Sequence, residues 1–135
     1  MMLENNIGLK KIRQVALPCT DIKRSKSFYQ STLGADFIAE FDPPGIIFFR
    51  FGGIRLMLER TESARAKGAV LYFEVDDITR SYKVLKDNGV SFDSEPHLIY
   101  RDEDGVFGKS GEEEWMAFFR DPDGNTLALV SRFVN

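Results

Sequence analysis

The amino-acid sequence predicts an α+β fold that consists of two tandem βαβββ modules. The pentapeptide Asp21–Ser25 (DIKRS) recurs further along the chain as Asp77–Ser81 (DITRS). Similarly, Leu56–Leu58 (LML) recurs as Leu127–Leu129 (LAL), at a wider separation. Each half also shows the same order of patterns, namely an apolar strand, a capped helix and three further strands. Such a repeat indicates two copies of one structural unit, and the wider separation of the second pair indicates an insertion in the second half.

The first half begins with an apolar segment, residues 12–19, that predicts a strand. Asp21 follows as an N-cap. The helix that it begins ends at Gly34, since glycine readily adopts the left-handed conformation that follows a last helical turn. The apolar positions of this helix are Ile22, Phe28, Tyr29 and Leu33. Three more strands are predicted near residues 37–41, 46–51 and 55–59, and turn residues separate them.

The second half repeats this order. Residues 70–75 predict a strand, Asp77 caps a helix over residues 78–88, and Gly89 ends that helix. The three later strands are predicted near residues 91–99, 115–119 and 126–133. Between the last two strands, the sequence Asp121-Pro122-Asp123-Gly124 has the residues of a type I turn, so we expect its role to be structural.

Length and composition fit a single domain of 135 residues, with module one over about residues 10–60 and module two over about residues 68–133. The net charge of −3 and the scattered Lys and Arg residues do not favour nucleic-acid binding. No apolar run is long enough to span a membrane, and the first residues do not resemble a signal peptide. The one cysteine, Cys19, has no partner for an internal disulfide. This favours a reducing compartment, so we expect a cytoplasmic protein. The thiol of Cys19 is expected to have a structural role.

Four motifs are spread along most of the chain: Gln14–Leu17 ahead of Asp21, Ser27-Phe28-Tyr29 with Leu33-Gly34, Phe73–Asp77, and Phe119–Asn125. Their combination resembles the vicinal-oxygen-chelate superfamily, which includes the glyoxalases, the bleomycin-resistance proteins and the extradiol dioxygenases. The resemblance implies that the two modules form a curved mixed sheet around a cleft. It implies no particular reaction, because one fold can carry many functions.

Metal enzymes of this superfamily place four ligands in the cleft, on the first and last strands of each module. The resemblance puts the corresponding positions at Gln14, Met57, Val70 and Ala128, and the repeat pairs the first with the third and the second with the fourth. A thioether and two alkyl side chains cannot serve as ligands in an oxygen- and nitrogen-rich metal site. We therefore expect no metal and no other cofactor, and a cleft that is shaped for an organic ligand.

Strand alternation adds further candidates for the pocket. If Leu56 faces the helix, then Arg55 faces the cleft, where it would favour an anionic ligand; alternatively, it is a solvated arginine. Tyr72 faces the cleft by the same reasoning. Glu59 and Glu74 also face the cleft. Together with His97, they are the nearest alternative source of metal ligands.

His97, the one histidine, is either an exposed hydrogen-bonded residue or a polar group of the pocket that acts as a general base with Glu113 or Glu114. Trp115 packs in the core or against a second subunit, or it stacks on a ligand. The polar, glycine-rich segment 100–114 predicts a mobile loop beside the cleft.

The leading interpretation is a metal-free protein that binds a small molecule and is similar to the bleomycin-resistance proteins. The second is a lyase or isomerase of the glyoxalase type, and the third is a non-catalytic interaction subunit. A short sheet with open edges and an open cleft predicts a homodimer. The expected partners are therefore a small-molecule ligand and a second copy of the chain, without nucleic acid or membrane.

Overall fold

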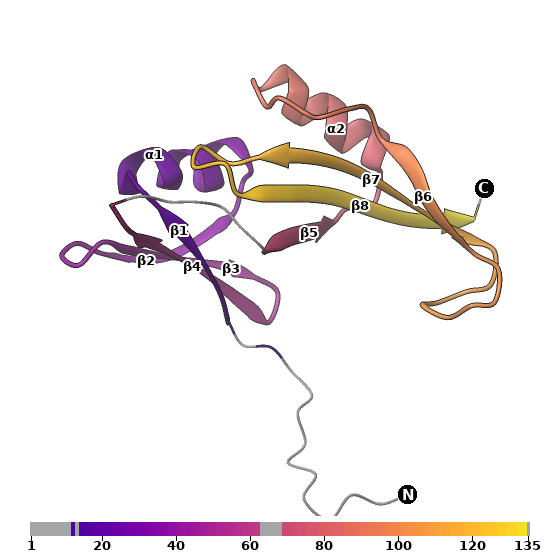
Figure 1. Ribbon diagram of the computed structural model, residues 1–135, viewed down its shortest axis with the longest axis horizontal. Coiled ribbons are helices and arrows are strands. Elements are labelled where there is room, and N and C mark those ends of the chain that lie inside the picture. The colour runs from indigo at the N-terminus through magenta and orange to yellow at the C-terminus, as the bar shows by residue number, and fades with distance from the viewer. Residues whose placement is uncertain (1–11, 13, 63–68, 135) are drawn as a thin grey trace, which may run out of the picture.

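The computed structural model describes residues 12, 14–62 and 69–134, and it confirms an α+β fold of two tandem modules (Figure 1). Module one contains one helical segment and the first four strands, and module two contains one helix and the last four. In chain order the elements are β1 (Gln14–Cys19), α1 (Ile22–Lys26), the π-helix η1 (Ser27–Thr32), β2 (Asp36–Phe41), β3 (Ile46–Phe51), β4 (Ile54–Arg60), β5 (Val70–Glu74), α2 (Ile78–Asp87), β6 (His97–Asp102), β7 (Glu112–Arg120) and β8 (Thr126–Val134).

The backbone hydrogen bonds of the described residues form two four-stranded sheets, one in each module. The strand order is β1-β4-β3-β2 in the first sheet and β5-β8-β7-β6 in the second. In both sheets the first strand of the module runs parallel to the last, and the other pairs are antiparallel. The two sheets therefore repeat one topology, as the sequence repeat predicts.

Both helices begin at the aspartates that the repeat identifies. The carboxylate of Asp21 accepts a hydrogen bond from the backbone N–H of Arg24 at 3.0 Å, and Asp77 accepts one from Arg80 at 3.1 Å. The predicted first helix differs in its second half, where the backbone winds as the π-helix η1. A π-helical turn accommodates one extra residue, which explains why the path from Asp21 to Gly34 is one residue longer than the path from Asp77 to Gly89.

The core lies between each helix and one face of its sheet. Leu56 and Leu58 of β4 and Leu127 and Leu129 of β8 are almost fully buried there, at no more than 4% exposed. Tyr29 of η1 is completely buried among them and lies 5.5 Å from Phe49, ring centroid to ring centroid. The alternation of the strands consequently gives each sheet a core face and an opposite face, which we call its open face.

The turn between β7 and β8 joins the two modules. The hydroxyl of Tyr29 donates to the carboxylate of Asp121 at 2.8 Å, and the side chain of Asn125 donates to the backbone carbonyl of Pro18 at 3.1 Å. Burial, and then the charge of Asp121, raise the pKa of Tyr29 far above its usual range, so its hydroxyl stays a neutral donor. The structural role expected for this turn is thus confirmed, with Gly124 at φ +84° in its fourth position.

The structure corrects two sequence predictions in module two. The sequence predicts a strand over residues 91–99, but Phe92 makes only an isolated bridge to Phe119, and β6 lies further along the chain. The loop expected over residues 100–114 is correspondingly reduced to residues 103–111. The buried carboxylate of Asp102 explains this shorter loop, because it accepts the backbone N–H groups of Val106 at 2.7 Å and Phe107 at 2.9 Å.

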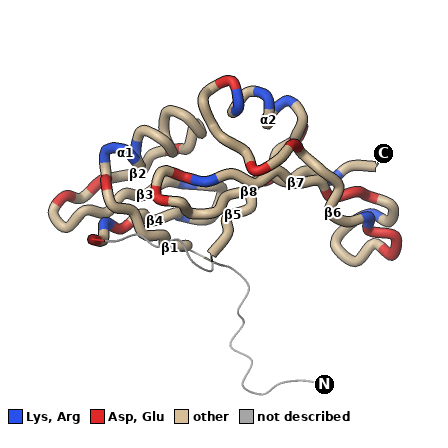
Figure 2. The backbone as a smooth tube through the Cα atoms, turned by 45° about the horizontal axis from the view of Figure 1, so that its top comes forward, with Lys and Arg blue, Asp and Glu red and all other residues tan. Residues whose placement is uncertain are grey.

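Lys and Arg residues are spread over both modules and alternate with Asp and Glu, so no extended basic face is formed by the described residues (Figure 2). None of the helices in the described part of the chain has the length and apolar character needed to cross a bilayer.

Candidate functional site

The open face of the first sheet brings three of the predicted pocket residues together. Gln14 of β1 lies beside Arg55 of β4, and the side-chain amide of Gln14 donates to the sulfur of Met57 at 3.8 Å. The guanidinium of Arg55 lies 5.8 Å from the centre of the Phe48 ring on β3. This face therefore offers an amide, a cation and a thioether beside an aromatic ring.

The open face of the second sheet carries the counterparts of these residues. Val70 of β5 lies beside Thr126 of β8, in the same register as Gln14 beside Arg55. Ala128 lies between Tyr72 on one neighbouring strand and Phe118 on the other, whose rings are 6.3 Å apart. Ala128 is completely buried, whereas Tyr72 is 53% exposed. This face is thus an aromatic surface over a small residue.

His97 and Trp115 lie on opposite faces of the second sheet. His97 pairs with Met116, which places it on the open face at the far edge strand, β6. Trp115 instead pairs with Ser131 and packs against the core, where its ring stacks on Phe133 at 6.1 Å and its N–H donates to Glu113 at 3.0 Å. The structure therefore does not bring Trp115 together with the residues of the open face.

The residues at the four positions inferred from the resemblance do not fit a divalent metal. Gln14 is the only one with an oxygen donor, and its amide nitrogen is engaged with the sulfur of Met57. Val70 and Ala128 have no donor atom. Within the described residues, no three His, Cys, Asp or Glu side chains are grouped so that they could hold a metal ion. Glu59, Glu74 and His97 thus do not form a replacement site with one another.

Two aromatic residues of the open faces were missed by the sequence reasoning. Phe48 pairs with Met57, and Phe118 pairs with Ala128, so they occupy equivalent places in the two modules. The signal was present in the sequence, because Phe48-Phe49-Arg50 recurs as Phe118-Phe119-Arg120. Among the described residues, no hydrogen bond, ion pair or ring contact connects the open face of one sheet to that of the other.

Comparison with known proteins agrees with this architecture. Residues 11–129 match the family model described as the glyoxalase/bleomycin resistance protein/dioxygenase superfamily. The chain belongs to this superfamily. Its members share the fold but not one reaction, so membership leaves the role of the open faces to be argued from their residues.

Individual members of the superfamily are similar over nearly their whole length. A glyoxylase-like domain-containing protein from Didymella fabae is 27% identical, and the match covers 90% of this chain and 94% of that protein. A superfamily member from Sphaerobacter thermophilus has a TM-score of 0.70 at 22% identity, covering 91% and 98% of the two chains. A lactoylglutathione lyase from Agrobacterium tumefaciens has a TM-score of 0.68 at 17% identity, covering 92% and 95%. These two structural similarities establish the fold alone.

Proposed function

We propose that the protein binds a small organic molecule on its open faces without a catalytic metal, and that it works as a homodimer in the cytoplasm. The observation that carries the proposal is the chemistry of the four positions described above. Met57, Val70 and Ala128 stand where the resemblance puts metal ligands, and aromatic rings lie beside two of them, Met57 and Ala128. Predominantly apolar surfaces with a few polar groups are typical of small-molecule sites.

The side chains of the open faces favour a flat ligand with an anionic group. Phe48, beside Arg55 on the first sheet, offers aromatic surface for a ring, and Tyr72 and Phe118 offer it on the second. Arg55 makes no ion pair with a carboxylate of the described residues, so its guanidinium is available to a carboxylate or phosphate of a ligand. The amide of Gln14 adds a neutral donor or acceptor. An aromatic acid combines the two complementary features.

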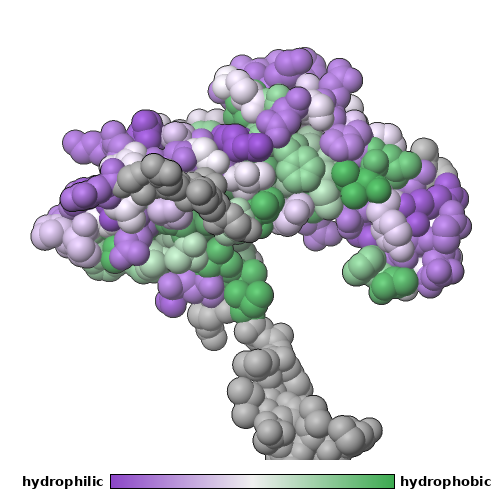
Figure 3. All heavy atoms as spheres, in the orientation of Figure 1, coloured by the Kyte–Doolittle hydropathy of each residue, from purple (hydrophilic) through white to green (hydrophobic). Residues whose placement is uncertain are grey.

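Exposed apolar side chains support the proposed homodimer. They gather at one end of the second sheet, where Figure 3 shows hydrophobic surface over β6 and at the end of the β6–β7 loop. Val106 and Phe107 are 65% and 73% exposed, and Leu98, Ile99 and Val134 are also exposed. Large apolar side chains exposed close to one another can be covered by association with a second copy. The single cysteine supports a reducing compartment such as the cytoplasm.

One observation favours an enzyme as the second candidate. The Nδ1 atom of His97 lies 3.2 Å from the backbone carbonyl oxygen of Glu95. A carbonyl can only accept, so Nδ1 donates in this contact, and in the neutral tautomer that does so Nε2 has a free lone pair. A neutral imidazole on the open face could then take a proton from a bound substrate, as a lyase or isomerase requires.

A thermal-shift panel of small aromatic acids tests the binding proposal. A ligand that binds only the folded state raises the midpoint of unfolding. We expect Tyr72→Ala and Arg55→Gln to reduce the shift, and Lys83→Gln on the exposed side of α2 to leave it unchanged. If no compound in the panel stabilises the protein, the open faces are not a binding site and the interaction subunit becomes the better interpretation.

Elemental analysis and titration with Zn²⁺, Ni²⁺ and Mn²⁺ test the metal-free state. We expect no stoichiometric metal. Metal that is lost in Gln14→Ala would overturn the proposal and favour the enzyme, whereas metal lost only in His97→Ala would mean a site elsewhere. Light scattering at micromolar concentration tests the homodimer, and a monomer alone would contradict it.

A further inference from the structure

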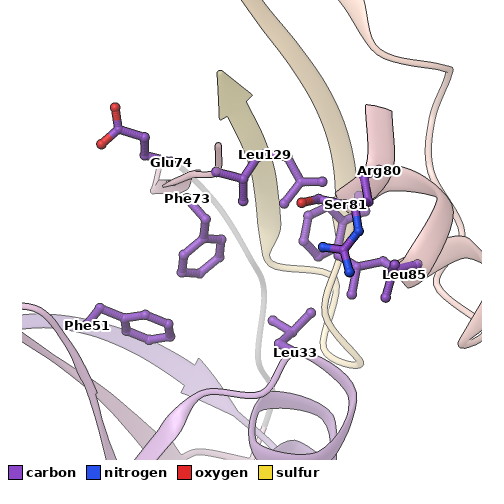
Figure 4. A pocket seen from close by; sticks show the side chains of 11 residues that line it. Leu33, Phe51, Phe73, Glu74, Arg80, Ser81, Leu85 and Leu129 are labelled. Atoms are coloured by element: carbon purple, nitrogen blue, oxygen red, sulfur yellow. The ribbon is translucent and has the colours of Figure 1, made fainter. Parts of the chain in front are cut away.

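A hollow lies on the helix side of the molecule, away from both open faces. It has a volume of about 320 Å³ and lies between α2 and the edge of module one. Its walls are apolar and include Leu33, Phe51, Phe73, Leu85, Phe119 and Leu129 (Figure 4). The rings of Phe51 and Phe73 come from different modules and are 5.0 Å apart, so this contact between modules closes one side of the hollow.

The repeat identifies what occupies the equivalent place in module one. There, at the start of α1, Arg24 donates to a carboxylate oxygen of Asp123 at 3.1 Å. Ser25 donates to the other oxygen of the same carboxylate at 3.3 Å. The backbone N–H and hydroxyl of Thr20 complete the set, at 3.1 and 2.6 Å. Module one thus binds a carboxylate, and the turn between β7 and β8 supplies it.

Module two repeats the arginine and the serine but receives no carboxylate. Arg80 and Ser81 are the counterparts of Arg24 and Ser25, because they end the two copies of the repeated pentapeptide. The counterpart of the acidic turn is the turn between β3 and β4, residues 51–54, whose sequence FGGI contains no acid. None of the ion pairs among the described residues includes Arg80.

The side chains around the hollow are oriented to receive an anion. Figure 4 shows that the guanidinium of Arg80 extends over the hollow between Ser81 and Leu85. The carboxylate of Glu74 points away from the other labelled side chains. The apolar walls lie directly below this cation. The arrangement matches a molecule with one carboxylate and a compact apolar body.

We propose that the hollow is a second ligand site, which binds a small amphipathic carboxylic acid. Its carboxylate accepts hydrogen bonds from Arg80 and Ser81, as Asp123 does from Arg24 and Ser25 in module one. Its apolar body lies against Phe51, Phe73 and the core leucines. A volume of about 320 Å³ is at the lower end for ligand sites and suits an acid of about eight carbon atoms.

One residue of module two opposes the anion. The counterpart of Thr20 is Asp76, which is exposed and carries a negative charge near Arg80 in the sequence. A threonine in its place would restore the donor set of module one. The site is thus predicted to bind the carboxylic acid weakly in the natural chain and more tightly in Asp76→Thr. This variant therefore tests whether the two modules bind a carboxylate in the same way.

Isothermal titration of the full chain with octanoate tests the proposal, and octanamide serves as the uncharged control. We expect octanoate to bind and octanamide to bind at least about tenfold more weakly. Arg80→Gln should weaken octanoate binding about tenfold or more, and Asp76→Thr should strengthen it. Arg80 is exposed, so the glutamine variant is expected to fold. Arg55→Gln, on the open face of the first sheet, is the matched control and should leave octanoate binding unchanged.

Three outcomes would overturn the proposal. The first is that octanoate does not bind at millimolar concentration. The second is that Arg80→Gln and Arg55→Gln weaken binding equally, which would place octanoate on the open faces instead. The third is an apparent Kd that rises with protein concentration, which would mean that a second copy of the chain fills the hollow. Because Arg55→Gln reports on the open faces separately, failure here is distinguishable from failure of the function proposed above.

Discussion

The hydroxyl of Tyr29 in the first module donates a hydrogen bond to the carboxylate of Asp121 in the second, across 92 residues of sequence. Asn125 donates to the same carboxylate oxygen at 2.7 Å, and two backbone N–H groups of the turn donate to the other oxygen. Donors from both modules therefore converge on one buried charge. A fully satisfied network of this kind rigidifies the contact that it forms.

Tyr29→Phe removes one donor from this carboxylate and leaves the ring in place. A buried hydrogen bond to a charged group contributes about 1.5–3 kcal/mol, so we expect a loss of about that size in the free energy of unfolding. Urea denaturation measures it. Tyr82→Phe is the control, because the hydroxyl of Tyr82 makes no hydrogen bond within the described residues. Equal stability of the two variants would show that the contact between the modules does not depend on this bond.

Ala128→Glu introduces an acid at the position where the resemblance puts a metal ligand. Ala128 is completely buried between Tyr72 and Phe118, so the new carboxylate enters between two aromatic rings that offer it no cationic partner. We expect destabilisation of about 2 kcal/mol or more at neutral pH. Thr126→Glu, at a half-buried position on the same face, should cost less. A stable Ala128→Glu protein that gains metal binding would mean that the aromatic pair readily opens.

The ion pair of Asp102 and Arg132 predicts a dependence of stability on pH. Burial alone would raise the pKa of Asp102, but the N–H donors of Phe107 and Val106, with Arg132 at 2.8 Å, outweigh burial and lower it below its ordinary value of 3.8. A carboxyl with a lowered pKa stabilises the fold fully above that ordinary value and loses its contribution as the pH falls below it.

Asp102→Asn should therefore be less stable than the natural protein at neutral pH. The difference in their free energies of unfolding should become smaller as the pH falls below 3.8. Urea denaturation at a series of pH values measures both proteins. Asp93→Asn is the control, since Asp93 forms an exposed pair with Arg120 that is expected to contribute little. A difference in free energy of unfolding that stays constant down to the lowest pH would contradict the lowered pKa of Asp102.

Gly45→Ala should be destabilising for two reasons. Gly45 has φ +104°, which residues with a Cβ rarely adopt, and an added Cβ would lie 2.7 Å from the guanidinium carbon of Arg60. That arginine pairs with Asp42 at 2.8 Å, so the pair must also move. We expect a loss of about 1–2 kcal/mol. Gly53→Ala, where a Cβ meets nothing within 4 Å, should be nearly neutral by thermal unfolding.

The parts of the fold that follow from local pattern could be predicted from the sequence. The N-caps at Asp21 and Asp77 and the alternation of β4 and β8 depend on neighbouring residues, and the repeat provides each signal twice. The π-helix was not predicted, because one extra residue hardly changes the spacing of the apolar side chains. The start of β6 was also misplaced, because Phe92 predicts a strand position but makes only an isolated bridge to Phe119, and β6 begins at His97.

The candidate site was predictable where alternation was applied and less so elsewhere. Gln14, Met57, Val70 and Ala128 all lie away from the core face, as expected. Alternation from Ala117 and Phe119 would also have placed Trp115 on the core face, as the structure does. By contrast, the pairing of Arg132 with Asp102, which lie 30 residues apart, depends on the register of three strands and leaves no local signal.

The turn at Asp121–Asn125 also affects how the chain must fold during its synthesis. The first module is translated long before this turn, so until residue 125 leaves the ribosome the hydroxyl of Tyr29 has no carboxylate and the carbonyl of Pro18 has no donor. The first module therefore emerges with an unfinished polar surface, and a nascent chain that stalls before the last hairpin cannot complete its first helix contacts. The first module is thus synthesised first but waits for the last turn of the second module to complete its polar contacts.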